Sequence, residues 1–285
     1  MTRLRIATRA SALALAQARW VADRVAEQHP GLDVVLVEVT TTGDADRISP
    51  VTTLTEVGAF VRSVQTAVLD GRADVAVHSC KDLPVNGPDR LRTVYPERES
   101  PWDVLCGASL DLLPSAAAVG TGSPRRTAQL ALLRPDLKIE GIRGNIDTRL
   151  GKVTAGEFHA IVLAEAGLNR IDRQDRIAQL LTVDQMVPAP AQGALALEFI
   201  AGSHSGEILA TLDHPETRTA VEAERSLLAR TGAGCRAALG ALALVDAAGV
   251  TMHGFVEDER GPRRARVRSE DAPSASLALQ HELGL

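Results

Sequence analysis

The sequence is poor in aromatic side chains, which make up only 2% of its 285 residues. Alanine, valine and leucine must therefore fill the core, and there is no basic face with interleaved aromatics of the kind that binds nucleic acid. The formal net charge of −5 argues against nucleic acid on separate grounds. No apolar run approaches the roughly 20 residues of a membrane span. We therefore expect a soluble, cytoplasmic protein.

Cysteine and lysine are also scarce. The three cysteines, Cys80, Cys106 and Cys235, cannot all pair, no C-x-x-C occurs, and the seven histidines lack the spacing of metal ligands. We expect no metal site and interpret Cys80 and Cys106 as small core residues. The chain has only three lysines and no G-x-x-x-x-G-K-[ST] loop, so the loop that would hold a single phosphate is absent.

The N-terminal segment combines arginines with apolar residues, as a targeting peptide does. Gln17 and Arg19 interrupt its apolar part, however. The segment fits a strand over Leu4–Thr8 followed by an amphipathic helix over Ser11–Ala26, so we expect no cleavage.

Arginine stands at the start of a predicted helix. Ser123 fits an N-cap and Pro124 the first helical position, which places Arg125 and Arg126 in the first turn. The helix dipole is positive there, so each cation costs about 0.3–1 kcal/mol. Backbone N–H groups, hydroxyls and guanidinium groups together make an anion site. The alternative interpretation is two solvated surface arginines.

The same arrangement recurs elsewhere in the chain. Asn145 fits a helix cap with Arg143 and Arg149 on either side, and Arg9 precedes another capped helix. Between residues 119 and 152 there are seven basic and three acidic side chains, against the global charge balance. Several separate arginines suit a ligand that carries several carboxylates.

Apolar periodicity alternates between strand and helix for most of the chain. This alternation predicts an α/β fold with mostly parallel sheets and helices on both faces. Ligands of such sheets lie beyond the carboxyl ends of strands, where each arginine motif falls. The predicted elements are strands at Val34–Thr41, Asp74–His78, Asp103–Gly107, Ala118–Gly120, Lys138–Gly141 and Ala160–Leu163, and helices at Phe60–Leu69, Ser123–Leu133 and Ile146–Lys152.

The C-terminal part has a different pattern. The two prolines of Met186–Pro190 fit a hinge or linker. Beyond it the pattern predicts a small α+β domain with antiparallel strands. Its elements are a helix at Glu216–Arg230, strands at Ala238–Asp246, Thr251–Glu257 and Arg264–Val267, and a closing helix at Ser274–Leu283.

Asp82 is the best candidate for acid–base or electrostatic chemistry. It follows a strand end beside His78, Ser79 and Lys81. A helix-capping aspartate or a Lys81–Asp82 surface pair would explain it equally well. His78 taken alone is more typical of a hydrogen-bonded strand histidine than of a catalyst.

Cys235 lies in a loop with a glycine on each side, at Gly232 and Gly234. Such a loop allows close approach by a bulky group or a tight turn. Arg236 next to it would lower the pKa of the thiol and favour thiolate. The alternative is a half-buried structural cysteine.

Six motifs follow one another along the chain: Arg5-Ile6-Ala7-Thr8-Arg9-x-Ser11, His78-Ser79-Cys80-Lys81-Asp82-Leu83-Pro84, Gly120-Thr121-Gly122-Ser123-Pro124-Arg125-Arg126, Arg143-Gly144-Asn145-Ile146-Asp147-Thr148-Arg149-Leu150, Gln192-Gly193-Ala194 and Gly234-Cys235. In this order they resemble the porphobilinogen deaminases, also called hydroxymethylbilane synthases. The resemblance covers residues 4 to 244.

The resemblance implies a fold of three domains, two of them bilobal α/β domains like those of periplasmic binding proteins. The expected boundaries are residues 1–98 with 191–213, residues 99–190, and residues 214–285. It further implies a transferase of porphyrin and heme biosynthesis that joins four porphobilinogen molecules head to tail and releases ammonia. The product it implies is the linear tetrapyrrole hydroxymethylbilane, and it also implies a monomer.

Site residues follow from the resemblance by motif position. Cys235 matches the thioether attachment point of a dipyrromethane cofactor, and Asp82 the catalytic carboxylate. Positions lining the cofactor and substrate cleft are matched by Arg9, Ser11, Gln17, Ser79, Lys81, Thr121, Ser123, Arg125, Arg126, Arg143, Asn145, Arg149, Arg170 and Gln192. The substrate's acetate and propionate arms would account for the arginines.

The chain departs from the family pattern at a few positions. The segment Leu54–Phe60 is shorter than usual and has Glu56 where a lysine can occur, and Ala191 replaces a glycine. Trp102, Glu165 and Arg236 also differ from the typical residues. These departures leave open a divergent paralogue that binds pyrroles or loads the cofactor without full synthesis. A non-enzymatic anion-binding module is a third interpretation, disfavoured by the domain that carries Cys235.

Overall fold

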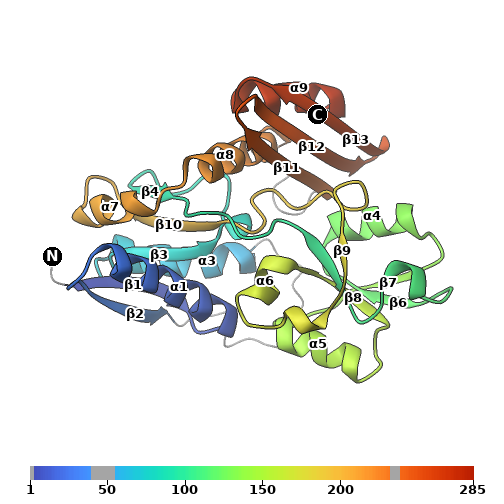
Figure 1. Cartoon of the computed structure of the whole chain (residues 1–285), viewed down its shortest axis with the longest axis horizontal. Coiled ribbons are helices and arrows are strands. Elements are labelled where there is room, and N and C mark those ends of the chain that lie inside the picture. Colours follow the sequence, from blue (N-terminus) through green and yellow to red (C-terminus); the bar gives the residue numbers. More distant parts are fainter. Residues whose placement is uncertain (1–2, 40–54, 232–237) are drawn as a thin grey trace. The chain divides into compact units, whose positions relative to one another are not determined.

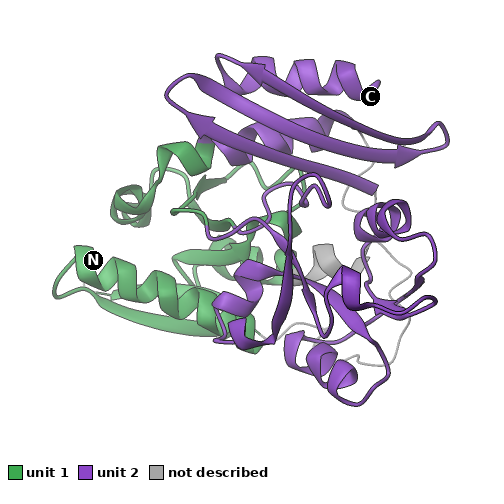
Figure 2. Cartoon of the chain, turned by 45° about the vertical axis from the view of Figure 1, so that its right-hand side comes forward, with its two compact units in different colours: residues 1–98, 194–218 green, residues 99–193, 219–285 purple. Residues whose placement is uncertain are grey.

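The computed structural model describes residues 3–39, 55–231 and 238–285, with backbone only for residues 55–60 (Figure 1). The chain divides into two compact units (Figure 2). The first unit comprises Met1–Arg98 and Ala194–Arg218, and the second comprises Glu99–Gly193 and Thr219–Leu285. The predicted division into three domains is not settled by this, because the second unit holds two sheets of different kinds.

The first unit is built on a five-stranded sheet with the order β2-β1-β3-β10-β4. Strand β1 pairs in parallel with β2 and β3, whereas β10 runs antiparallel to both β3 and β4. Four strands therefore share one direction, and β10 alone opposes them. The strands are β1 (Arg3–Arg9), β2 (Asp33–Val39), β3 (Val75–Ser79), β4 (Leu91–Val94) and β10 (Leu195–Ile200).

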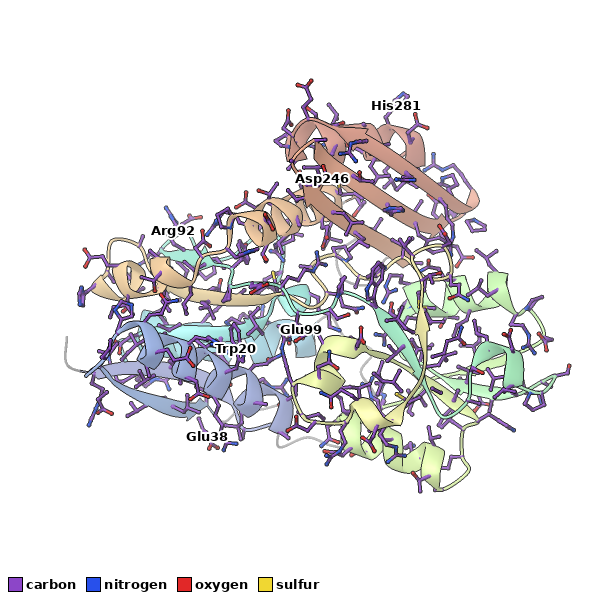
Figure 3. All side chains as sticks on the ribbon, in the orientation of Figure 1. Trp20, Glu38, Arg92, Glu99, Asp246 and His281 are labelled. Atoms are coloured by element: carbon purple, nitrogen blue, oxygen red, sulfur yellow. The ribbon has the colours of Figure 1, made fainter. Side chains whose placement is uncertain are left out.

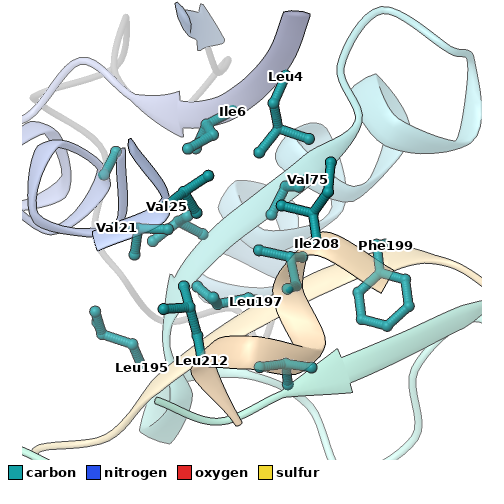
Figure 4. Close-up of a cluster of buried hydrophobic side chains, with 14 residues drawn as sticks. Leu4, Ile6, Val21, Val25, Val75, Leu195, Leu197, Phe199, Ile208 and Leu212 are labelled. Atoms are coloured by element: carbon teal, nitrogen blue, oxygen red, sulfur yellow. The ribbon is translucent and has the colours of Figure 1, made fainter. Parts of the chain in front are cut away.

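Helices pack against this sheet because their apolar residues recur at helical spacing. Ser11 caps α1 (Ala12–Gln28), as predicted, by accepting from the N–H of Ala14. Apolar residues of α1 and of α7 (His204–Leu209) join one core cluster of the sheet, drawn in Figure 4. α3 (Thr55–Leu69) belongs to a second cluster with Ala7 and Ala76. Two short 3₁₀ helices, η1 (Cys80–Asp82) and η4 (Ala210–Leu212), complete the unit.

The second unit contains a sheet with the order β7-β6-β8-β5-β9, which repeats the pattern of the first. Strand β6 is parallel to β7 and β8, and β5 opposes β8 and β9. The strands are β5 (Asp103–Cys106), β6 (Ala118–Gly120), β7 (Lys138–Glu140), β8 (Ala160–Ala164) and β9 (Ile177–Leu181). The helices are α4 (Pro124–Leu133), α5 (Ile146–Thr154) and α6 (Glu165–Asn169), with η2 (Leu110–Leu112) and η3 (Gln174–Arg176) between strands.

The C-terminal sheet is antiparallel, as predicted, with the order β11-β12-β13. Its strands are β11 (Ala238–Asp246), β12 (Gly249–Asp258) and β13 (Gly261–Ser269). α8 (Pro215–Thr231) leads towards it, and α9 (Ala272–Leu283) packs on β12 and β13. Charged side chains such as Asp246 stand outward from their ribbons, as do Glu38 and Arg92 in the first unit (Figure 3).

The predicted α/β class and its mostly parallel sheets are confirmed by this topology. The stretch Met186–Pro190 forms neither helix nor strand, as its two prolines predict, but it is not a loose hinge within the second unit. Val187 and Pro188 are buried, and Pro188 accepts from the N–H of Ala241 in β11 at 2.9 Å. Sequence patterns did not reveal β4, β9 or β10.

Two negative findings concern the residues described. No helix among them is long and apolar enough to cross a membrane. No group of three or more histidine, cysteine or acidic side chains within the same ranges is placed to hold a metal ion. Cys80 and Cys106 are buried, as predicted for core residues.

Candidate active site

The first set of candidate residues lies at the carboxyl ends of β1 and β3. Strand β1 ends at Arg9 and runs into the helix capped by Ser11, while β3 ends at Ser79 and runs into η1. Because β1 and β3 are parallel neighbours, the two motifs meet at one edge of the sheet. The sequence-predicted residues Arg9, Ser11, Gln17, Ser79, Lys81 and Asp82 therefore share one end of the first unit.

Hydrogen bonds fix the turn that carries Asp82. The buried Gln17 donates to the hydroxyl of Ser79 at 2.8 Å, which joins α1 to the end of β3. The N–H of Cys80 donates to Ala194 O at 2.9 Å, so the turn is anchored on β10's side as well. Asp82 itself is exposed. The turn thus holds a carboxylate at the surface, where it can meet a ligand.

His78 is a buried strand residue, but the predicted hydrogen bond is not formed, because its Nε2 has no hydrogen-bond partner among the described residues. It is buried on β3, with its Nε2 3.1 Å from the carboxylate of Glu198 on β10. Gln65 of α3 donates to both carboxylate oxygens of Glu198, at 3.1 and 2.9 Å. Sequence reasoning missed Glu198 and Gln65. The available signal was a single acidic residue inside the otherwise apolar strand Leu195–Ile200.

The second set begins where β6 meets α4. Ser123 caps α4, and its own N–H donates to the hydroxyl of the buried Thr121 at 3.2 Å. Gly120 leaves little room for a side chain, because a Cβ there would lie 3.0 Å from Ile161 and 3.1 Å from Phe158. The strand end, the hydroxyl turn and the Pro124 helix start are all as predicted.

Arg125 and Arg126 are buried, so the interpretation that they are solvated surface residues is wrong. Both donate to Asp103 at the start of β5: Arg125 Nη1 at 2.7 Å to one oxygen, and Arg126 Nη2 at 2.6 Å to the other. Burial by itself raises the pKa of the Asp103 carboxyl, but the two arginines outweigh this and hold it well below its usual value. The motifs gave no sign of Asp103.

Arg143 and Arg149 flank the start of α5, with Asn145 as the predicted cap. Asn145 Oδ1 accepts from the N–H of Thr148 at 2.8 Å. Arg143 is exposed, whereas Arg149 is half-buried and donates to Gly144 O at 2.8 Å. Burial lowers the pKa of Arg149, and the charge of Arg126 lowers it further. Arg149 makes no salt bridge to any carboxylate in the described part of the chain.

Arg170 and Gln192 belong to the first chain segment of the second unit, Glu99–Gly193. Arg170 follows α6 and donates to Gly193 O at 2.6 Å. Burial lowers its pKa to about 10, and the charge of Glu99 opposes that shift. Gln192 is buried and donates to Pro101 O at 2.8 Å and to Asp103 at 3.0 Å.

The structure thus places the candidates in two sets, one in each unit. The second set is Thr121, Ser123, Arg125, Arg126, Arg143, Asn145, Arg149, Arg170 and Gln192. Cys235 and Arg236 lie outside the described residues, as do the side chains of residues 55–60. Among the other residues that depart from the family pattern, Ala191 has a left-handed backbone with φ +60°. Glu165 accepts from the Ser100 hydroxyl, and Trp102 O accepts from the N–H of Glu165 at 3.0 Å.

Chemically, the two sets differ. The first offers an exposed carboxylate beside Ser79 and Lys81, and the second offers guanidinium groups near the starts of α4 and α5 that range from buried to exposed. Charge-assisted hydrogen bonds from such groups suit carboxylates or phosphates. By class, this is an α/β protein whose candidate anion-binding residues gather at the carboxyl ends of its strands.

The chain belongs to the porphobilinogen deaminase family. The family model described as "Porphobilinogen deaminase, dipyromethane cofactor binding domain" matches residues 4–207. A porphobilinogen deaminase of Roseiflexus castenholzii is 43% identical over 98% of this chain and 95% of its own. One of Acidothermus cellulolyticus is 46% identical over 98% of this chain and 87% of its own. One of Maridesulfovibrio salexigens is 41% identical over 99% of this chain and 95% of its own.

The chain is also weakly similar to solved structures of substrate-binding and solute-binding proteins. Substrate-binding domain 2 of Lactococcus lactis GlnP aligns with 81% of this chain and 91% of its own, at a TM-score of 0.45 and 12% identity. An ancestral cationic amino acid solute binding protein aligns over the same shares at a TM-score of 0.43 and 15% identity. The fold class stands on the sheet topology given above.

Proposed function

We propose that the protein is a transferase that joins four porphobilinogen molecules head to tail, releases ammonia at each step and yields hydroxymethylbilane for tetrapyrrole biosynthesis. Membership of the family supports this, as do relatives named porphobilinogen deaminase that match nearly the whole chain. The near-complete coverage favours a full enzyme over a partial paralogue.

One observation in the structure carries the proposal. Arg149 is half-buried, burial and the charge of Arg126 both lower its pKa, and no salt bridge to a carboxylate of the described residues balances its charge. Burying a cation in this way is unfavourable unless an anion joins it. Porphobilinogen bears an acetate and a propionate arm, so a growing pyrrole chain supplies such anions repeatedly. The half-buried Arg170 offers a further donor of the same kind.

The dipyrromethane cofactor named in the family model fits this donor set, because it carries the same carboxylate arms as the substrate. When bound, it supplies the primer to which the first substrate ring is joined. Arg126, Arg149 and Arg170 would hold its acidic arms. Cys235 is its proposed thioether attachment point and lies outside the described residues.

Asp82 is proposed as the catalytic carboxylate. Loss of ammonia leaves positive charge on the pyrrole ring, and attack by the next ring places it on a ring nitrogen. A preorganised carboxylate stabilises charge that develops in this way. The Gln17–Ser79 bond and the Cys80–Ala194 bond hold the turn in place, so Asp82 needs little reorganisation.

The remaining predicted residues complete the proposal. Arg9, Ser11, Gln17, Ser79 and Lys81 would line the substrate side of the first unit, and Thr121, Ser123, Arg143, Asn145 and Gln192 that of the second. The three predicted domains, a monomeric state and a cytoplasmic location belong to the same proposal. Light scattering of the purified protein checks the monomer directly.

The test is an assay of tetrapyrrole release. Purified protein is mixed with porphobilinogen, and the linear tetrapyrrole and ammonia are quantified together. The proposal predicts one tetrapyrrole for every four ammonia released. Substrate consumption without tetrapyrrole would identify the partial paralogue, and no consumption at all would refute the enzyme.

A further inference from the structure

Asp103 is a buried carboxylate on which three candidate binding residues converge. It has no exposed surface and stands at the start of β5. Arg126 donates through Nε and Nη2 to Oδ1 at 2.9 and 2.6 Å, and Gln192 donates to the same oxygen at 3.0 Å. Arg125 donates to Oδ2 at 2.7 Å. One side chain therefore orients three others.

The two arginines are held differently. Arg125 is 3% exposed, and its Nη1 also donates to Val187 O at 2.8 Å. Arg126 lies close enough to Arg149 for its charge to lower the pKa of that residue. Asp103 balances one of the two guanidinium charges. Asp103 therefore leaves one positive charge of the pair unbalanced. Arg126 is the more exposed of the two arginines, at 7%, and its Nη1 also donates to Val162 O at 2.9 Å.

A second buried carboxylate anchors the same network. Gln192 is presented by a turn in which Ala191 has φ +60° and Gly193 has φ +89°. The side chain of Glu224, on α8, accepts from the N–H of Ala191 and from the N–H of Ala243 in β11. α8 ends at Thr231 and β11 begins at Ala238, so Glu224 ties both elements that flank Cys235 to the Gln192 turn.

We infer that Asp103 is a positioning residue of the carboxylate site: through its pair with Arg125 it orients Arg126 and Gln192, while Arg125 itself contacts no ligand. This inference rests on the proposed function. It divides the predicted arginines into one that supports the site and others, Arg126 and Arg149, that meet the acidic arms.

A pair of variants tests whether Arg125 supports the site or contacts the ligand directly. Asp103→Asn keeps an acceptor for Arg126 but leaves the charge of Arg125 buried without a counter-charge. The double variant Asp103→Asn with Arg125→Met removes that charge and keeps the apolar bulk of the stem. Replacement of a buried ion pair by apolar groups is often tolerated, whereas removal of one partner is not.

The readouts are the fraction of protein carrying the dipyrromethane adduct, by intact mass, and KM and kcat for porphobilinogen. We expect Asp103→Asn to lose most of the adduct and to raise KM about tenfold or more in the fraction that is loaded. The double variant is expected to regain most of both. A double variant that is worse than Asp103→Asn would show that Arg125 meets the ligand itself and would overturn the inference.

Asp74→Asn is the matched control. Asp74 also pairs with an arginine, accepting from Arg5 Nη2 at 2.8 Å, but it stands before β3, at the opposite end of its strand from the candidate residues. It should lower the melting temperature and leave adduct and KM unchanged. If Asp103→Asn changes only the melting temperature, as Asp74→Asn does, Asp103 is merely structural and the inference fails.

Two further measurements keep the test decisive. If Asp103→Asn does not fold, Arg125→Met is compared with Arg126→Met, and the inference requires the larger rise in KM for Arg126→Met. Equal rises would contradict it. Wild-type protein without any adduct would instead refute the proposed function, so the two failures are distinguishable.

Discussion

The two five-stranded sheets share one pattern of parallel and antiparallel neighbours but carry different chemistry at the carboxyl ends of their strands. In the first unit that end presents an exposed carboxylate, Asp82, on a hydrogen-bonded turn. In the second it presents Arg126, which is buried, and Arg149, which is half-buried. The scaffold is repeated while the site residues differ, which is the general relation between fold and function.

The two sheets also differ in how the buried acid of their antiparallel strand is paired. Each carries a buried carboxylate, Glu198 on β10 and Asp103 on β5. Glu198 accepts from the neutral Gln65, whereas Asp103 accepts from two arginines. Glu198 also lies 3.1 Å from His78 Nε2. Among the described residues no arginine pairs with Glu198, whereas two pair with Asp103.

The largest effect is expected from Asp82→Asn in the first unit. Loss of one preorganised charged group lowers a rate by about 10²–10³. Because Asp82 is exposed, the melting temperature and the adduct should not change. Stopped assays of tetrapyrrole release measure the rate, and Asp89→Asn, another exposed aspartate nearby in sequence, is the control. Turnover near the wild-type value would remove Asp82 from the mechanism.

In the second unit, Arg149→Gln should raise KM for porphobilinogen by about 10- to 100-fold, since a hydrogen bond to a charged group contributes about 1.5–3 kcal/mol. It should also raise the melting temperature. The pKa of Arg149 is lowered by burial and by Arg126, so the folded state disfavours its charge and a neutral side chain relieves that cost. Arg62→Gln in the first unit serves as the control. A lower melting temperature with unchanged KM would mean that Arg149 is structural.

A smaller effect is expected from Glu198→Gln, and it should differ from that of Asp103→Asn. Glu198→Gln keeps an acceptor for Gln65. Unlike the loss of Asp103, it leaves no buried arginine without a counter-charge. The free energy of unfolding should therefore fall by no more than about 1 kcal/mol. Adduct and KM should stay at wild-type values, in contrast to Asp103→Asn. Thermal melting and intact mass check both. Loss of adduct in Glu198→Gln would contradict the view that only the buried acid of the second unit supports cofactor binding.

The smallest effect concerns the backbone of the second unit. Ala191 has φ +60°, a conformation that glycine adopts without strain. Ala191→Gly should therefore stabilise the protein by about 0.5–1 kcal/mol, measured by urea unfolding. Ala189→Gly, two residues earlier and without positive φ, should destabilise it by a similar amount. Destabilisation by both would show that the turn is not strained.

The sequence predicted those features that depend on local patterns. Ser11, Ser123 and Asn145 cap the helices that they were expected to cap, because a cap is set by residues a few positions apart. The alternation of strand and helix patterns predicted the α/β class. The apolar pattern of the C-terminal segments predicted their antiparallel strands.

What the sequence did not reveal depends on residues far apart in the chain. Strand β10 pairs with β3, more than a hundred residues earlier, and carries no helix or turn signal of its own. Asp103 meets Arg125 and Gln192 only after folding. Arginine at a helix start predicted an anion site, but local pattern does not show that one of the anions is the protein's own carboxylate.

The intact mass of the purified protein tests the central claim most directly, namely that the arginines hold a tethered, acidic pyrrole chain. Wild-type protein should be heavier than its polypeptide by two pyrrole units, and Cys235→Ala should have the bare mass. Cys106→Ala should keep the adduct, since burial raises the pKa of that thiol to about 11 and leaves it unreactive. A bare wild-type mass, or an adduct that survives in Cys235→Ala, would contradict the account.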